Sequence, residues 1–153
     1  MKLPEGIGQR EVLIGIGILV IVGIIAVPLM GYSQKKNRRA ECEQLVESIR
    51  TAQIAHAKAF PGEGYVSAKW APRDPSALTG DAVEWVQNQG FRSIGWTPAA
   101  AGFEWVRGTY RIAATADTFT VIGKCDIDAN GIPSVFEATH ESAVSSKTAA
   151  DIY

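Results

Sequence analysis

The chain has 153 residues, 46% of them hydrophobic, which suits one globular domain with an appendage. Its formal net charge of −1 gives no reason to expect a nucleic acid or an acidic substrate as the primary partner. The mean hydropathy of +0.03 hides an uneven distribution, because the apolar residues are concentrated near the N-terminus.

An uncharged apolar run extends from Val12 to Met30. At about 1.5 Å per residue, a helix of this length spans the roughly 30 Å hydrocarbon core of a bilayer. A cleaved secretory signal would have a shorter core and small residues at its cleavage site, whereas this run ends in VPLM. A helix packed on the core of a domain of this size would keep a polar face towards solvent, which the run lacks. The run therefore predicts a transmembrane helix.

Apolar side chains recur at helical spacing after this run, over residues 33–60. They form one stripe made of Cys42, Leu45, Val46, Ile49, Ala52 and Phe60. The charged residues placed away from the stripe are Glu41, Glu43, Glu47 and Arg50. Pro28 weakens the helix locally, and Phe60-Pro61-Gly62 stops it. We therefore predict one long, kinked helix from about Val12 to Ala59, with an amphipathic second half.

Residues 61–102 are rich in proline, glycine and alanine, which indicates an irregular connecting loop. We expect a short helix within it at Asp81–Asn88, with Val83 and Val86 facing inward. Four strand patterns follow, at Phe103–Arg107, Thr109–Ala114, Thr118–Ile127 and Ile132–Thr139.

The third strand pattern is apolar on one face, which carries Phe119, Val121, Cys125 and Ile127. We expect an antiparallel meander over residues 103–139 whose apolar face covers the helix stripe. The predicted fold class is thus α+β, with a long N-terminal helix packed on a C-terminal antiparallel sheet. We expect a C-terminal tail over residues 140–153, in which the serine- and alanine-rich residues 142–150 are loosely ordered and Tyr153 pins the end.

The two cysteines fall on surfaces that are expected to meet. Cys42 lies on the helix stripe and Cys125 on the apolar strand face, so a disulfide between helix and sheet is plausible. The alternative is two buried thiols that behave as small hydrophobic groups. Two cysteines without clustered histidines do not make a zinc site.

Residues 126–137 read DIDANGIPSVFE and match a calcium-loop pattern. The pattern assigns ligands to Asp126, Asp128, Asn130 and Glu137, with the turn glycine at Gly131. Strands flank the segment, however, where such loops have helices. The alternative is a tight hairpin in which Asn130-Gly131 is the two-residue turn and both aspartates face solvent. Calcium is the one cofactor that the sequence suggests.

Catalytic patterns are not found in the sequence. His56 is expected to be a satisfied core histidine and His140 a surface histidine, because neither has a nucleophile or carboxylate pattern beside it. The aromatic residues are expected to fill a small core and subunit contacts: Trp85, Trp96, Trp105 and Tyr110. We therefore expect a protein that is not an enzyme.

The N-terminus carries a specific combination of residues. The short, basic leader MKLPEG ends in Gly6, Glu11 is the fifth residue after it, and the apolar run follows at once. This combination resembles the type IV prepilin signal, and Pro28 falls at the position where that family's first helix has its proline. The resemblance implies a pilin-like roll, cleavage between Gly6 and Ile7 by a leader peptidase, and methylation of the new N-terminus at Ile7.

Glu11 has two interpretations. A carboxylate at the head of an apolar helix is costly in lipid unless it is partnered. After cleavage, the amino group of Ile7 in a neighbouring subunit could neutralise Glu11 and set the register between subunits. Otherwise Glu11 is a solvated first-turn acid at the membrane interface, although the adjacent Arg10 could compete for it in the same chain.

The resemblance divides the chain into a leader (1–6), a transmembrane and filament-core half of the helix (7–31) and a globular domain (32–153). It implies a structural subunit of a type IV pilus-like filament. Such a subunit is single-pass in the inner membrane before assembly, then part of a periplasmic or cell-surface filament, and its partners are the leader peptidase and other pilin subunits. The alternatives are a pseudopilin of a type II secretion system and a single-pass membrane-anchored binding or adhesion module.

The charges that flank the apolar run disagree with this topology. Lys2 and Arg10 precede the run, whereas more cations follow it: Lys35, Lys36, Arg38 and Arg39. The positive-inside rule alone would place the C-terminal domain in the cytoplasm. The leader motif and the cysteines favour the opposite orientation.

Overall fold

Helix α1 spans Gln9–Ala59 in the computed structural model, which describes the backbone of residues 9–153 and the side chains of residues 31–153. The predicted long helix and its end before Phe60 are confirmed. Residues 35–153 form one compact unit and residues 1–34 another. Among helices with described side chains, none is long and apolar enough to cross a membrane. The side chains of the run 12–30 lie outside that part.

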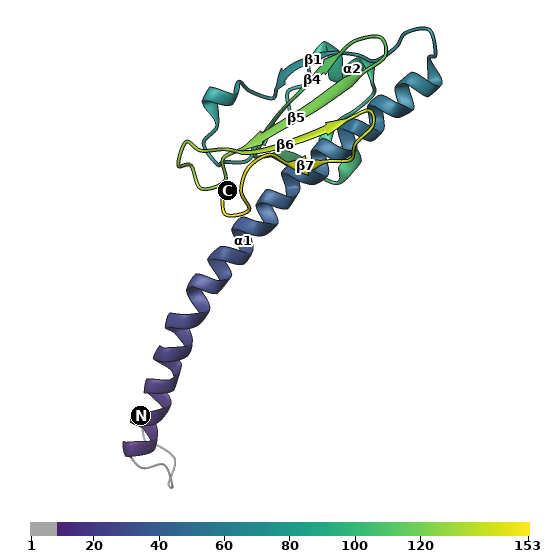
Figure 1. Cartoon of the computed structure of the whole chain (residues 1–153). Coiled ribbons are helices and arrows are strands. Elements are labelled where there is room, and N and C mark those ends of the chain that lie inside the picture. The colour runs from purple at the N-terminus through teal and green to yellow at the C-terminus, as the bar shows by residue number, and fades with distance from the viewer. Residues whose placement is uncertain (1–8) are drawn as a thin grey trace. The chain divides into compact units, whose positions relative to one another are not determined.

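The second half of α1 packs on an antiparallel sheet, so the α+β fold class is confirmed (Figure 1). The sheet has five strands in the order β1-β4-β5-β6-β7. Their bounds are Ala68–Ala71 (β1), Thr109–Ala114 (β4), Phe119–Cys125 (β5), Ser134–Thr139 (β6) and Ser145–Ser146 (β7). Strand β5 alternates strictly between buried and half-buried residues, as expected of a strand with one face on the core.

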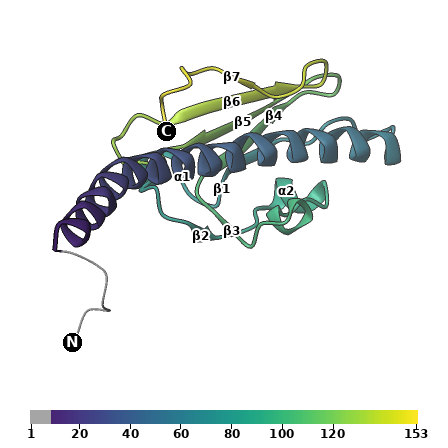
Figure 2. The same cartoon turned by 90° about the horizontal axis from the view of Figure 1, so that it is seen from below.

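Smaller elements occupy the segment before the meander: the 3-10 turns Pro75–Ala77 (η1) and Pro98–Ala101 (η2), the helix Gln89–Ser93 (α2), and the strands Val83–Glu84 (β2) and Trp105–Val106 (β3). Strands β2 and β3 pair in a separate two-stranded sheet. In Figure 2, β6 and β7 lie on one side of α1, and β2, β3 and α2 lie on the other.

Three expectations for this segment were wrong. The helix expected at Asp81–Asn88 is absent, because Val83 and Glu84 pair with β3 and the Asn88 side chain instead caps α2 by accepting from the Phe91 N–H. Val86 is 65% exposed and does not face inward. The strand expected at 103–107 is shortened to β3 and does not join the meander.

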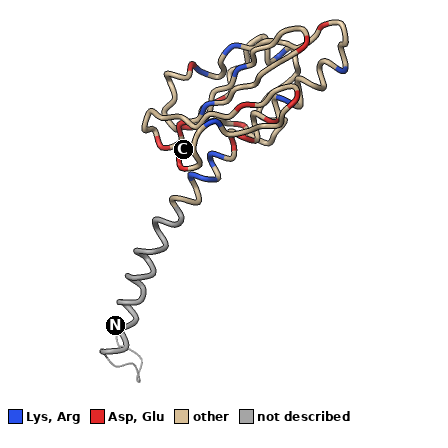
Figure 3. Tube along the Cα trace, in the orientation of Figure 1, with Lys and Arg blue, Asp and Glu red and all other residues tan. Residues whose placement is uncertain are grey.

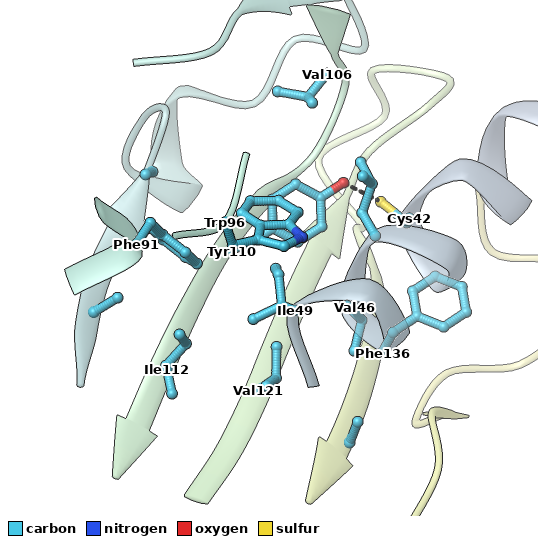
Figure 4. Close-up of a cluster of buried hydrophobic side chains, with 14 of the residues drawn as sticks. Cys42, Val46, Ile49, Phe91, Trp96, Val106, Tyr110, Ile112, Val121 and Phe136 are labelled. Carbon is cyan, nitrogen blue, oxygen red and sulfur yellow. Dashed lines mark hydrogen bonds between the residues drawn. The ribbon is translucent and has the colours of Figure 1, made fainter. Parts of the chain in front are cut away.

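The core lies between α1 and the sheet (Figure 4). Its fully buried members from the helix stripe are Cys42, Leu45, Val46 and Ile49. Phe60, predicted to extend the stripe, is 51% exposed because it lies beyond the helix end. Trp96 and Tyr110 are buried in the core, whereas Trp105 is 55% exposed, and the expected subunit contacts stay a prediction.

Glycine sets the distance between α1 and the central strand. A β-carbon at Gly123 of β5 would lie 2.5 Å from Cγ2 of Val46. Only a residue without a side chain therefore lets the helix backbone approach β5 this closely. The two cysteine-bearing elements are thereby held in contact.

Candidate functional site

Several residues of α1 bind the rest of the domain, and four of them lie where the helix enters the second compact unit. We call these four the helix clamp: Lys35, Arg39, Glu41 and Cys42. Positions separated by three or four residues share a helix face, so this stretch presents several side chains to the sheet at once. The clamp begins at the first residue of the second compact unit, directly after the N-terminal half of α1. It therefore attaches the first turns of α1 within this unit to the loops, the sheet and the C-terminal tail.

Arg39 binds the C-terminal region. Its Nε donates to Oγ of Ser134 at 3.3 Å, and its Nη2 donates to Oγ of Ser146 at 2.8 Å and to the Ala149 carbonyl at 3.3 Å. The guanidinium also lies 4.9 Å from the ring centroid of Phe136. One side chain thus ties α1 to β6, β7 and the tail.

The C-terminal tail is more ordered than predicted. Residues 145–146 form strand β7, the Thr148 hydroxyl accepts from the Val135 N–H at 3.1 Å, and the Ile152 carbonyl accepts from the Ser134 hydroxyl at 2.6 Å. Tyr153 is only 7% exposed. The tail follows β6 closely because hydroxyl groups replace the missing strand hydrogen bonds.

Glu41 is buried, although the sequence pattern placed it away from the core. Its side chain is 6% exposed, and its Oε1 accepts from the Arg107 N–H at 3.0 Å. Its Oε2 lies 2.9 Å from Nη1 of Arg107. A buried carboxylate with both a backbone donor and a guanidinium is satisfied, so burial is tolerated.

Replacing Glu41 by alanine should lower the free energy of unfolding by about 2 kcal/mol, because the Arg107 N–H and guanidinium lose their acceptor. Urea unfolding of the full chain in a non-ionic detergent measures this. The matched control is Glu43→Ala, an exposed acid of the same helix, which should change the value by less than about 0.5 kcal/mol. Equal losses in the two variants would contradict the assigned role of Glu41.

A disulfide joins Cys42 to Cys125, in agreement with the first of the two interpretations of the cysteines. The Cα atoms are 6.5 Å apart, and neither residue is exposed. The Tyr110 hydroxyl lies 3.5 Å from Sγ of Cys42. Burial, with the negative charge of Glu41, raises the pKa of Tyr110 well above its usual value, so the phenol stays protonated.

The segment 126–133 that joins β5 to β6 is closed by its own polar side chains. Asp126 is 3% exposed and accepts from the N–H groups of Asn130 at 3.1 Å and Gly131 at 2.8 Å. Asn130 Oδ1 accepts from the Ile132 N–H at 2.7 Å. The two-residue hairpin with both aspartates toward solvent was therefore wrong, because Asp126 organises a longer loop from inside.

The other two predicted calcium ligands have different partners. Asp128 Oδ2 lies 3.4 Å from Nζ of Lys35, and Glu137 Oε1, within β6, lies 3.3 Å from Nζ of Lys147. Within residues 31–153, no three histidine, cysteine, aspartate or glutamate side chains are grouped so that they could hold a metal ion. Calcium binding by this loop stays a prediction.

Each of the two histidines lies near a glutamate. His56 is 7% exposed, and its Nε2 lies 3.6 Å from Oε2 of Glu63, too far for a hydrogen bond. His56 is thus buried as expected but its Nε2 is not satisfied within the described part of the chain. His140 is half-buried beside Glu141.

The predicted processing residues Gly6 and Ile7 lie outside the described residues, as do the side chains of Glu11 and Pro28, so their roles stay predictions. Comparisons with protein-family models, curated proteins and solved structures found no match to this chain. Because the side chains of the predicted processing and assembly residues are not described, the helix clamp is the part of the candidate site that the structure describes.

Proposed function

We propose that the chain is a structural subunit of a type IV pilus-like filament, with a pilin-like roll as its domain. It assembles through its N-terminal apolar helix after removal of the leader. The observation that carries this proposal is a single helix of 51 residues whose second half is tied to an antiparallel sheet by the helix clamp, while its first half contains the uncharged run. A subunit that assembles through its N-terminal helix needs such a connection between that helix and its domain.

The edges of the sheet support assembly through the helix. At the β1 edge, Asn88 donates from Nδ2 to the Lys69 carbonyl at 2.8 Å, and Gly90 packs directly on Ala68. At the other edge, β7 has two residues. A covered edge and a very short one offer little template for strand addition. The apolar helix is then the principal surface for polymerisation.

The charges after the apolar run fit an outward-facing domain better than the sequence alone indicated. Lys35 pairs with Asp128, and Arg39 binds Ser146 and the tail, so two of these cations have partners inside the domain. Positively and negatively charged residues are also interspersed along residues 35–153 (Figure 3). We infer an inner-membrane precursor with a cytoplasmic N-terminus, and a disulfide-containing domain in an oxidising compartment.

Mass analysis of the chain recovered from cell envelopes tests the processing step. We expect a mature chain that begins at Ile7 and carries one added methyl group. Gly6→Val should leave the leader in place, because a β-branched side chain replaces the smallest residue at the cleavage point. The matched control is Gly8→Val, on the other side of Ile7. An intact Met1 in the wild type, or a cut after Met30, would remove the proposal.

A further inference from the structure

The face of the sheet that points away from α1 carries a tryptophan among cations. Trp70 of β1 is next to Arg111 of β4, because Ala71 pairs with Tyr110. Lys124 of β5 follows on the same face, since its neighbour Cys125 points into the core. The register of β1 is irregular between Ala68 and Ala71, and Lys69 lines the same concavity as Trp70 and Arg111. We call Lys69, Trp70, Arg111 and Lys124 the outer cationic face.

Both long cations contact the indole. The Arg111 guanidinium carbon is 5.2 Å from the Trp70 ring centroid, and Nζ of Lys124 is 5.6 Å from it. These distances lie within the range of cation–π attraction, which orients the side chains over the sheet. Arg111 and Lys69 are nevertheless exposed and Trp70 is half-buried, so charge and ring surface remain open to solvent.

An open concavity of about 650 Å³ lies at this place, lined mainly by β1 and β4 with Trp70, Asp74 and Arg111. This volume is in the range of small-ligand sites. A flat aromatic ring with a guanidinium beside it presents both an apolar surface and a planar pair of donors.

The outer cationic face is positively charged, but the nearby Asp74 reduces its net charge. The Ser76 hydroxyl donates to Oδ1 of Asp74 at 2.7 Å, which, with the Ser76 N–H and the charge of Lys124, lowers the pKa of Asp74. Asp74 therefore stays ionised and offsets one cation. Such a surface suits a ligand with one or two negative charges better than a polyphosphate chain, which needs a longer track of cations and repeated stacking residues.

We propose that the outer cationic face binds an acidic saccharide, that is, a sugar bearing a carboxylate or a sulfate group. The apolar C–H face of the sugar ring lies on the indole of Trp70. The anionic group pairs with the guanidinium of Arg111 through two hydrogen bonds and is attracted by Lys69. The net charge of −1 does not oppose this, because the cations are gathered locally. The binding does not depend on filament assembly.

Calorimetric titration of the full chain in non-ionic detergent tests the proposal with a trigalacturonate, a sulfated galactose trimer and a neutral galactose trimer. We expect an acidic trimer to bind, and the neutral one to bind at least about tenfold more weakly. Trp70→Ala and Arg111→Gln should each weaken the binding of the acidic trimer about tenfold, and Arg111→Lys should restore part of it. The control Lys58→Gln removes an exposed charge from α1 and should change nothing.

The two acidic trimers distinguish a carboxylate ligand from a sulfate ligand. The proposal would be overturned by no binding of either acidic trimer up to about 10 mM, by equal binding of the neutral trimer, or by unchanged affinity in Trp70→Ala and Arg111→Gln. Tighter binding of a single-stranded oligonucleotide than of both trimers would also overturn it. Unfolding midpoints of the variants close to that of the wild type would show that a loss of affinity comes from the outer cationic face and not from a disrupted fold.

Discussion

Replacing Glu11 by alanine should nearly abolish incorporation of the chain into filaments. In the proposed assembly, the Glu11 carboxylate neutralises the amino group of Ile7 on a neighbouring subunit inside an apolar core. Removal of one partner leaves the other as an unpaired buried charge, which costs about 3 kcal/mol or more per contact. Incorporation should therefore fall by about two orders of magnitude. Immunoblotting of the sheared filament fraction against the membrane fraction measures it.

The control for this experiment is Glu43→Ala, an exposed acid on the same helix within the domain, which should assemble as the wild type does. Membrane insertion should be normal in both variants. Normal assembly of Glu11→Ala would mean that Glu11 is a solvated first-turn acid. If the wild-type chain also remains a stable monomer in detergent, the membrane-anchored binding module is the better description.

Removing the disulfide should have the largest effect on the stability of the domain. The bridge closes a loop with a sequence separation of 83, for which chain-entropy estimates give about 4–5 kcal/mol. The double variant Cys42→Ala with Cys125→Ala avoids a lone reactive thiol and leaves only small cavities. We expect its free energy of unfolding in urea to be about 3–5 kcal/mol below that of the wild type.

Wild-type protein unfolded in the presence of a reductant should reproduce most of this loss, because the same constraint is released without a mutation. Native, non-reduced protein should show no thiol that labels, even after unfolding, since both cysteines are bonded. Two thiols that label after unfolding without reductant would contradict the bridge, and an unchanged unfolding energy in the double variant would contradict its contribution.

Local periodicity was sufficient for the elements that bury one face. The strand predicted at Thr109–Ala114 matches β4 residue for residue, and the alternation in β5 gave the correct inward face. The same two patterns indicated that Cys42 and Cys125 face each other, because both periodicities mark a side chain that points into the core. In these elements the buried positions repeat at a regular spacing, so the sequence alone was sufficient to predict which side chains are buried.

Elements that exist only through distant partners could not be predicted in this way. Strands β2 and β3 contain two residues each and are defined by their pairing with each other. Glu41 resembles a solvated helix acid until Arg107, 66 residues away, is placed beside it. Asn130-Gly131 is a strong signal for a two-residue hairpin turn. The buried Asp126 carboxylate instead accepts a hydrogen bond from the Gly131 N–H, and the loop between β5 and β6 is longer than two residues. The predicted assembly residues lie outside the described side chains.

The position of the disulfide has a mechanical consequence. It joins α1 to β5, which is the middle strand of the sheet and has a hydrogen-bonded neighbour on either side. A pulling force applied along the helix from its N-terminal end reaches β5 through covalent bonds alone, so the intervening residues 43–124 carry no tension when the domain is held at its C-terminal strands. A domain with this connection can transmit tension from α1 to its C-terminal strands without extension of residues 43–124.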